Sequence, residues 1–300
     1  MTTVTVLTSI YNSQAFLEGY FAALSRMEDK KEIEILLIHN APNEEELTII
    51  EKHTRQFNFL KHIVVEKKES LYASWNRGIS IASGEYIAIW NVDDIRLPSS
   101  LNVQREALDK SGAAMCYGDF YGTDKYGPFK QRIYQYKEYH SLKKDVLRRH
   151  IIGCFPMWRK SIHREIGYFD EQFKLVGDFD FQIRVALRYD LVKAGSFLGY
   201  YLENQQHKLS SNRKLQDMER TIVELRYRIY DKIMLHVLPF ISDFRINEML
   251  YSSNWIKLKS MLGSSNRVTI RSVFSLISAP FTYTTWLIRK SLVRLARIIS

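Results

Sequence analysis

Short apolar runs alternate with stretches of helical spacing along the first hundred residues. The apolar runs predict β-strands at residues 3–10, 33–39, 60–66 and 86–90. Apolar side chains at helical spacing predict helices between them, at residues 14–27, 43–55 and 71–82. Asn43 is expected to cap the second of these helices, whose first turn is acidic. This alternation predicts an α/β fold, in which a doubly wound sheet is flanked by helices.

The middle and the end of the chain carry weaker patterns. Residues 113–120 predict a further strand, and "YGTDKYG" after it predicts a hairpin turn. Asp178 or Asp180 is expected to open an amphipathic helix. Beyond about residue 211 helical spacing is kept by Met218, Ile222, Leu225, Ile229 and Ile233. We therefore predict a first domain at residues 1–210 and a helical C-terminal extension at residues 211–300 with a basic amphipathic end.

Polar clusters follow three of the predicted strands. They read "TSIYN" after the first strand, "HNAPN" after the second and "NVDD" after the fourth. In open α/β sheets ligands bind outside the carboxyl ends of the strands, so these clusters are expected to line one crevice. Burying the adjacent carboxylates of Asp93 and Asp94 without a partner is costly. Either they form the solvated cap of a following helix, or they hold a divalent cation that is shared with a diphosphate.

Glycine-rich phosphate-binding motifs are missing from the sequence. It contains no G-x-x-x-x-G-K-[ST] segment and no G-x-G-x-x-G segment after a strand. If the crevice binds a nucleoside diphosphate, a magnesium or manganese ion at Asp93 and Asp94 would carry most of the diphosphate charge.

Three blocks of the sequence resemble the inverting glycosyltransferases of the GT-A fold, of the family 2 type. The blocks are "TVLTSIYNSQAFL", "YASWNRGISIASGEYIAIWNVDDIRLPSSL" and "IGYFDEQFKLVGDFDFQIRVAL", and together they span about residues 3–190. The resemblance implies the GT-A fold, which is a doubly wound mixed sheet flanked by helices.

The same resemblance implies a role for several side chains. Tyr11 would stack on the nucleotide base, close to Thr8 and Ser9. Asp93 and Asp94 would contact the ribose and a divalent cation, Mn²⁺ or Mg²⁺, bound to the diphosphate. Asp178 would be the general base, whereas Asp180 is expected to cap its helix or orient its neighbours. Further donor contacts are expected from His39, Asn40, Asn76, Arg77 and Asn91.

The sequence departs from the family pattern at five positions. His39 and Asn40 stand where the family usually has an aspartate that reads uracil, and His39 can also be interpreted as a strand-end histidine without a special role. Asn91 replaces an acidic residue of the metal motif but keeps an oxygen donor. Gly177 replaces the glutamate often found before the base, and Trp75 replaces a residue that is often basic.

The excess positive charge of the sequence is concentrated near the C-terminus. The net charge is +10, and eight of the ten excess charges lie after Glu248, where no acidic residue follows. Residues 264–300 end in a basic amphipathic helix that starts near Trp286, which suits an anionic membrane surface. The alternative is a helix packed on the first domain. Nucleic acid is not expected as a partner, because no recognition motif accompanies the charge.

The remaining bulk features are ordinary for a folded protein. The sequence is 46% apolar and 25% charged, and no secretory signal or long uninterrupted apolar run is recognised. Its two cysteines, Cys116 and Cys154, are expected to be reduced thiols rather than a disulfide or part of a zinc site. We therefore expect a cytoplasmic protein that makes peripheral contact with the inner face of the membrane.

The function predicted from the sequence is transfer of a sugar from a nucleotide-diphosphate donor, a UDP-sugar, to a glycan or lipid-linked acceptor hydroxyl by single displacement. Two alternatives remain open. A catalytically inactive descendant would bind nucleotide sugar or glycan as an assembly partner. A nucleotidyltransferase that makes the activated sugar would release pyrophosphate, but it is disfavoured by the missing phosphate loop.

Overall fold

The fold is described by a computed structural model. The described residues are 3–28, 30–137, 146–147, 149–203 and 212–227. The chain separates into two compact units, Met1–Lys208 and Leu209–Ser300, and each is described by itself. The predicted domain boundary at residue 210 stays a prediction.

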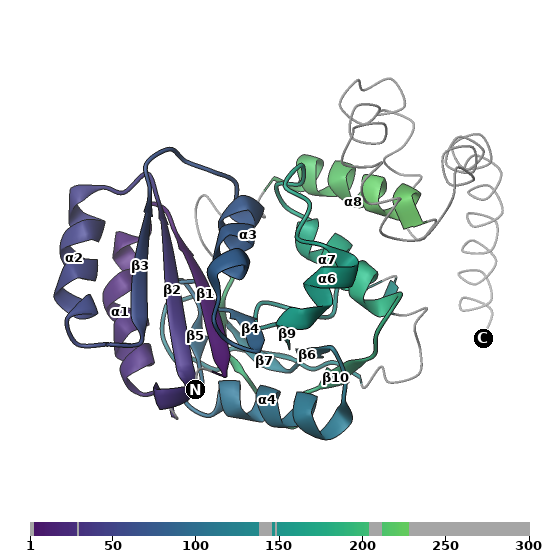
Figure 1. Ribbon diagram of the computed structural model, residues 1–300, viewed down its shortest axis with the longest axis horizontal. Coiled ribbons are helices and arrows are strands. Elements are labelled where there is room, and N and C mark those ends of the chain that lie inside the picture. Colours follow the sequence, from purple (N-terminus) through teal and green to yellow (C-terminus); the bar gives the residue numbers. More distant parts are fainter. Residues whose placement is uncertain (1–2, 29, 138–145, 148, 204–211, 228–300) are drawn as a thin grey trace, which may run out of the picture. The chain divides into compact units, whose positions relative to one another are not determined.

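A seven-stranded sheet forms the centre of the first unit (Figure 1). Its strand order is β10-β6-β9-β4-β1-β2-β3. Neighbouring strands are parallel except that β9 runs antiparallel to both β4 and β6, so the sheet is mixed. The strands are β1 (Val4–Ile10), β2 (Ile33–Asn40), β3 (Leu60–Val65), β4 (Tyr86–Ile89), β6 (Met115–Tyr117), β9 (Met157–Arg159) and β10 (Leu191–Lys193).

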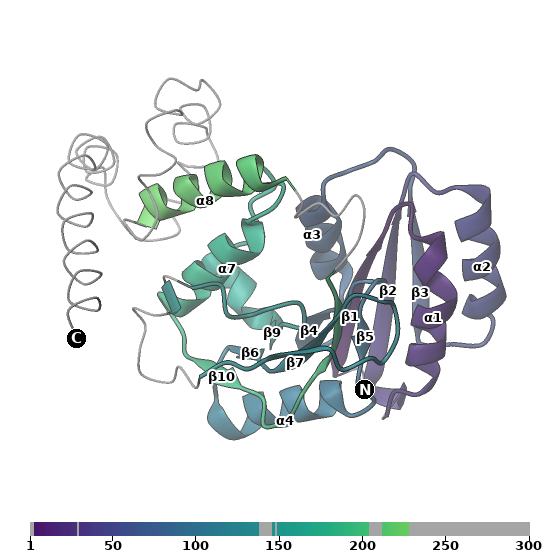
Figure 2. The ribbon, with the colours of Figure 1, turned by 180° about the vertical axis from the view of Figure 1, so that it is seen from behind.

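Helices cover both faces of this sheet. In Figures 1 and 2, α1 and α2 lie on one side of strands β1 to β3, and α3 lies on the other. Successive residues of β2 therefore meet different helices and are all buried, which explains the continuous apolar run "IEILLIH". The helices are α1 (Gln14–Ser25), α2 (Glu44–Thr54), α3 (Leu71–Ile81), α4 (Ser100–Ser111), α6 (His163–Ile166) and α7 (Gly177–Ala186), with 3₁₀ turns at Lys30–Glu32 and Lys160–Ile162.

A second, four-stranded sheet has the order β5-β11-β7-β8. Its strands are β5 (Ile95–Arg96), β11 (Gly199–Leu202), β7 (Phe120–Thr123) and β8 (Arg132–Tyr134). Strands β7 and β8 pair antiparallel, which confirms the hairpin predicted at "YGTDKYG".

The prediction of one strand over residues 113–120 is wrong. The segment divides into β6 in the large sheet and β7 in the small one. The chain leaves the large sheet at Gly118, where an added Cβ would lie 2.7 Å from the side chain of Leu198. The next residue, Asp119, accepts a hydrogen bond from Tyr136 N (2.9 Å) and pairs with Lys193 (2.9 Å), which fixes the change of direction.

Most predicted elements of the first hundred residues are confirmed to within two residues at each end. Asn43 caps α2 as predicted, because its side chain accepts a hydrogen bond from Glu46 N at 2.9 Å. Helix α7 begins at Gly177 with Val176 as the N-cap residue, so Asp178 and Asp180 lie in its first turn rather than at the cap. The short strands β5, β9, β10 and β11 and helix α4 were not predicted.

The described part of the second unit is α8 (Arg213–Tyr227). This helix confirms the helical pattern expected beyond residue 211. The periodic positions Ile229 and Ile233 and the basic segment 264–300 lie outside the described residues. Over the part of the chain that the structure describes, no helix has the length and apolar character needed to cross a membrane.

Candidate active site

The three polar clusters lie on one edge of the large sheet, as the sequence predicts. Strands β1, β2 and β4 run parallel, with Ile10 opposite His39 and Leu7 opposite Ile89. Trp90, directly after β4, donates a hydrogen bond from its backbone N to Leu7 O (3.1 Å). The segments that follow Ile10, His39 and Trp90 are therefore neighbours at the carboxyl ends of the strands.

The turns at this edge have an uncommon backbone. Asn12, after β1, has φ 50°, and Ala41, after β2, has φ 42°. They are the two non-glycine residues with positive φ among the described residues. A side chain in this region costs on the order of 1 kcal/mol or more, and such strain concentrates at functional sites.

Tyr11 presents its ring to solvent at the end of β1. The residue is 40% exposed, and the Lys68 Nζ lies 3.6 Å from its ring centroid. Ser13 donates from Oγ to Tyr11 O (3.1 Å), which holds the turn. Thr8 is buried, with its hydroxyl 2.8 Å from the Tyr20 hydroxyl, so its side chain belongs to the core. The partly exposed Ser9 lies between Thr8 and the tyrosine.

His39 is enclosed by polar partners. Its Nε2 lies 3.1 Å from Glu46 Oε2, and its Nδ1 lies 3.0 Å from His62 Nε2. Burial raises the pKa of the Glu46 carboxyl, but hydrogen bonds from His39 and from Ser13 N outweigh burial and leave this pKa lowered. Burial, together with the charge of His39, lowers the pKa of His62. Both ring nitrogens of His39 are therefore occupied within the protein.

Asn40 and Arg77 belong to a second network of hydrogen-bonded side chains. Asn40 donates from Nδ2 to Ser74 Oγ (2.7 Å) and accepts from Glu69 N (3.1 Å). Arg77 makes two bonds to the Glu69 carboxylate, at 2.7 and 3.1 Å. These contacts fix the segment before α3 against the end of β2.

Asn76 and Trp75 hold a loop that precedes α7. The Asn76 side chain accepts from Phe169 N (2.9 Å) and donates to Phe169 O (2.9 Å). Trp75 is buried and meets the Phe169 ring edge-on, with 5.2 Å between ring centroids. A core aromatic thus takes the place where the family often has a basic side chain.

Asp93 and Asp94 differ in their surroundings. Asp94 is fully buried, and its carboxylate accepts from Asn91 Nδ2 (3.2 Å) and Leu202 N (3.4 Å). Asp93 is partly exposed. Arg96 is buried near Asp94, and although the carboxylate opposes the effect, burial lowers the pKa of Arg96 to about 10. Internal partners thus explain how a carboxylate can be buried directly after a core strand.

The carboxylates of Asp93 and Asp94 act on two nearby tyrosines. Burial, and then the charges of Asp93 and Asp94, raise the pKa of the Tyr126 hydroxyl. The same carboxylates, after burial, help to raise the pKa of Tyr201. Within the described residues no group of three or more histidine, cysteine or acidic side chains is arranged to enclose a metal. The partly exposed carboxylate of Asp93 suits a hard cation such as Mg²⁺ or Mn²⁺ when a diphosphate supplies further oxygen ligands.

Asp178 lies in the first turn of α7 and contacts α3. Its backbone N donates to the Tyr72 hydroxyl at 3.3 Å. An added Cβ on the preceding Gly177 would lie 2.7 Å from the Tyr72 ring. A glutamate at this position, as in the family pattern, would therefore clash with the Tyr72 ring.

The carboxylate of Asp178 forms an ion pair with His150, at 3.3 Å between Oδ2 and Nε2. Its other oxygen accepts from Phe179 N at 2.8 Å. Burial raises the pKa of Asp178, but the nearby charge of His150 and the hydrogen bond from Phe179 N outweigh this effect and leave the pKa lowered. Asp178 is therefore ionised at neutral pH, as a general base must be. Asp180 instead pairs with Arg184 at 2.9 Å in the core, which confirms that it orients a neighbour.

Helix α3 connects the catalytic candidate to the sheet edge. Ser74 in its first turn bonds Asn40 at the end of β2, and Tyr72 in the same turn bonds Asp178. Figure 1 shows α3 and α7 side by side above the sheet. Asp178 therefore lies near the carboxyl ends of the strands.

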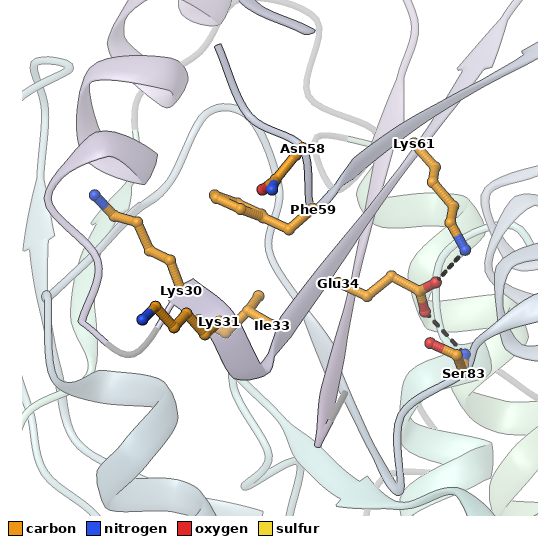
Figure 3. A pocket seen from close by; sticks show the side chains of 8 residues that line it. All are labelled: Lys30, Lys31, Ile33, Glu34, Asn58, Phe59, Lys61 and Ser83. Atoms are coloured by element: carbon orange, nitrogen blue, oxygen red, sulfur yellow. Dashed lines mark hydrogen bonds and ion pairs between the residues drawn. The ribbon is translucent and has the colours of Figure 1, made fainter. Parts of the chain in front are cut away.

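A different hollow, of about 540 Å³, opens at the opposite edge of the sheet (Figure 3). It lies where β2 begins, with Ile33 and Glu34 in its lining. Glu34 accepts hydrogen bonds from Lys61 (2.7 Å) and Ser83 N (2.8 Å), so its carboxylate is satisfied internally. This hollow shares no residue with the predicted site.

Several residues around Tyr11 and Asp178 were not predicted from the sequence. Lys68 lies over the Tyr11 ring, Tyr72 and His150 contact Asp178, and Gln182 bonds the backbone on both sides of His150. The spacing of Asp178 and Gln182, four residues apart, places both on one face of α7 and is a signal that was available. His150 gives no such signal, because an irregular segment separates it from Asp178 in the sequence.

A mixed, doubly wound sheet with this polar edge is the architecture of GT-A glycosyltransferases, and the chain is an enzyme of that class. The model of the family described as Glycosyl transferase family 2 matches residues 5–167, and the chain belongs to this family.

Curated relatives are similar over part of the chain. An uncharacterized glycosyltransferase of Methanocaldococcus jannaschii is 27% identical over 221 residues, which cover 70% of this chain and 74% of the relative. A cholesterol galactosyltransferase of Borreliella burgdorferi is 30% identical over 120 residues, which cover 39% of this chain and 32% of the relative.

Solved structures share the fold at low sequence identity. TarS 1–349 of S. aureus, in complex with UDP-GlcNAc, has a TM-score of 0.64 and 16% identity, covering 93% of this chain and 81% of that chain. The mannosyltransferase PcManGT of Pyrobaculum calidifontis, in complex with GDP-Man and Mn²⁺, has a TM-score of 0.59 and 12% identity, covering 98% of this chain and 86% of that chain.

Proposed function

We propose that this protein is an inverting glycosyltransferase that moves a sugar from a nucleoside-diphosphate donor to a hydroxyl of a glycan or lipid-linked acceptor. A UDP-sugar is the proposed donor. One observation carries the proposal: the Asp178 carboxylate, whose pKa is lowered beside His150, lies at the start of α7, close to the polar carboxyl ends of the strands.

Asp178 is the proposed general base. An acceptor hydroxyl is a weak nucleophile, so a carboxylate must take its proton as its oxygen attacks the anomeric carbon. The nucleoside diphosphate leaves from the opposite face of the sugar, and this single displacement inverts the anomeric configuration. His150 favours the ionised carboxylate, and Tyr72 fixes the backbone from which it projects.

Asp93 and Asp94, with Asn91, are the residues proposed to hold a divalent cation. The partly exposed Asp93 is suited to touch the cation, while the buried Asp94 contributes charge and positions Asn91. When bound, Mn²⁺ or Mg²⁺ would offset the negative charge that develops on the leaving diphosphate.

Tyr11 is the proposed platform for the nucleotide base, and its exposed ring beside Lys68 supports this role. Thr8 and Ser9, near the end of β1 and just before Tyr11, also remain proposed donor-site residues. His39, Asn40, Asn76 and Arg77 remain proposed donor-site residues. Their polar atoms already bond to neighbouring residues. We therefore propose that these four residues hold the walls of the donor site in place rather than form hydrogen bonds to the donor.

The basic segment 264–300 is proposed to contact an anionic membrane surface. Its support is the sequence, in which the last 52 residues carry eight basic and no acidic side chains. This contact would place the enzyme in the cytoplasm, at the inner face of the membrane, close to lipid-linked acceptors.

A donor screen with Mn²⁺ tests the proposal. The full chain is incubated with a panel of nucleotide sugars and simple glycosides, and free nucleoside diphosphate is measured. We expect release with a UDP-sugar, loss of release on chelation, and a decrease of at least about a hundredfold in Asp178→Asn. Asp190→Asn, which changes an exposed aspartate, is the matched control and retains activity.

Two other outcomes would replace this function. Donor binding without release of nucleoside diphosphate under any acceptor would indicate a binding partner, an alternative motivated by His39, Asn40 and Asn91. Release of pyrophosphate would indicate a nucleotidyltransferase.

A further inference from the structure

A second hollow, of about 290 Å³, borders the ion pair of the proposed base. We name it the His150 hollow, and it is lined by Gln135, Tyr136, Lys137, Arg149, His150 and Ile151. Its connection to the reaction is direct, because the His150 Nε2 lies 3.3 Å from Asp178 Oδ2.

Buried groups anchor the first wall of the hollow. The backbone N of Tyr136 donates to the Asp119 carboxylate at 2.9 Å. The hydroxyl of Tyr117, a buried residue of β6, donates to Lys137 O at 3.0 Å. Both contacts reach from the sheet region to the backbone of this wall.

A single buried amide anchors the second wall. Gln182, one turn after Asp178 on α7, donates to Arg149 O at 2.7 Å and accepts from Ile151 N at 2.8 Å. These bonds fix the backbone on both sides of His150, so the imidazole and the carboxylate are held by the same helix. The hollow is thus built onto the element that carries the proposed base.

Positive charge dominates the lining. Lys137 and Arg149 are exposed, and in the described part of the chain no carboxylate lies within 4.0 Å of the charged nitrogens of either. His150 pairs with Asp178, and the lining itself contains no acidic residue. A pair of cations in an anchored hollow is suited to a tetrahedral oxyanion.

We propose that the His150 hollow is an acceptor subsite that binds a phosphate group of the acceptor. The inference rests on the proposed function, because the donor would occupy the sheet edge and the acceptor must reach Asp178 from elsewhere. A phosphate held by Lys137 and Arg149 would place a nearby hydroxyl of the same acceptor at the base. The phosphate can belong to a lipid headgroup or to a water-soluble phosphorylated glycan.

Proton NMR of the histidine side chains of the full chain tests this subsite, with glycerol 3-phosphate as the probe and glycerol as the neutral control. The His150 resonance is assigned by its absence in His150→Gln. We expect glycerol 3-phosphate to shift this resonance saturably and glycerol to leave it in place. The double variant Lys137→Ala, Arg149→Ala is expected to bind the probe about tenfold more weakly. Lys31→Ala, at the opposite edge of the sheet, is the matched control and retains wild-type binding.

A sedimentation assay with phosphatidylglycerol vesicles distinguishes the two sources of phosphate. Weaker vesicle binding by the double variant, in addition to weaker probe binding, supports a lipid phosphate. Unchanged vesicle binding with weaker probe binding supports a soluble phosphorylated glycan.

The subsite is refuted if glycerol 3-phosphate leaves the His150 resonance in place, or if the double variant, shown to be folded by its circular dichroism, binds the probe as well as wild type. This readout needs no turnover. Failure of the subsite is therefore distinct from failure of the glycosyltransferase proposal, which the release of nucleoside diphosphate from wild type decides.

Discussion

His150 and Asp178 face each other across 3.3 Å, although they come from an irregular segment and from the first turn of a helix. The histidine offsets the burial of the carboxylate and leaves the pKa of Asp178 below its ordinary value. The pKa of the proposed base therefore depends on a residue that need not touch substrate. It also determines which way the pH profile moves when the histidine is changed.

We expect His150→Gln to shift the acidic limb of the pH profile of kcat/KM to higher pH. Burial raises the pKa of Asp178 and the charge of His150 lowers it, so removing the histidine leaves burial with less opposition and raises this pKa. Nucleoside diphosphate release measured across the pH range checks this. His53→Gln, which removes the histidine paired with exposed Glu18, is the control and keeps the wild-type limb. An unchanged limb in His150→Gln would refute the coupling.

Gly177→Ala is expected to reduce the rate of release by about ten- to hundredfold with a smaller effect on donor KM. The new Cβ would lie 2.7 Å from the Tyr72 ring, so the ring and the backbone of Asp178 must separate, and small displacements of a base are costly. Steady-state kinetics measures both quantities. Gly195→Ala is the matched control, since an added Cβ there meets no atom within 4 Å. Equal activity of the two variants would contradict the role of Tyr72.

Ala41→Gly is expected to stabilise the protein by about 0.5–1 kcal/mol, because glycine relieves the positive φ of this turn. Urea denaturation of the two proteins measures the difference. The control is Ala22→Gly on the exposed face of α1, where the same substitution is expected to destabilise by about 1 kcal/mol. Destabilisation at both positions would mean that the turn after β2 is not strained.

Glu46→Gln is expected to lower the free energy of unfolding at neutral pH by about 1–3 kcal/mol, because a buried, charge-assisted bond to His39 is lost. The folded-state pKa of Glu46 is lowered, so its contribution is present above the unfolded-state pKa and disappears as the pH falls through the folded-state value. The difference between variant and wild type should therefore shrink in acid.

Urea midpoints measured from neutral to acid pH check the Glu46 prediction. Glu51→Gln changes an exposed glutamate in the same helix and is expected to cost less than about 0.5 kcal/mol at any pH. A constant difference between Glu46→Gln and wild type at all pH values would show that the ionised carboxylate contributes nothing.

Local sequence patterns were sufficient to predict the strands and helices at the centre of the sheet and the polar residues at the strand ends. The run 33–39 contains only apolar residues before its terminal histidine, apart from Glu34, and this pattern requires a strand covered on both faces. Parallel strands joined by helices bring their carboxyl ends to one edge, so the proximity of Tyr11, His39 and Asn91 followed from local patterns and connectivity alone.

The roles of the side chains at that edge depend on contacts between segments that are distant in the sequence. His39 and Asn40 end strand β2, where donor-binding residues are expected, yet Glu46 and Ser74 bond to their side chains. The two adjacent aspartates look equivalent in the sequence, but only the path of β11 places Leu202 N on Asp94 and buries it. Contacts between segments far apart in the chain have no periodicity, so local patterns cannot encode them.

The same reason explains why His150 and the division of residues 113–120 were missed. Short strands such as β6 and β7 are specified by their partners rather than by their own few residues. The ion pair of Asp178 depends on Gln182 folding an irregular segment back onto α7. The spacing of apolar residues predicts which positions are buried. The pairing of polar groups from distant segments is fixed only when the chain packs.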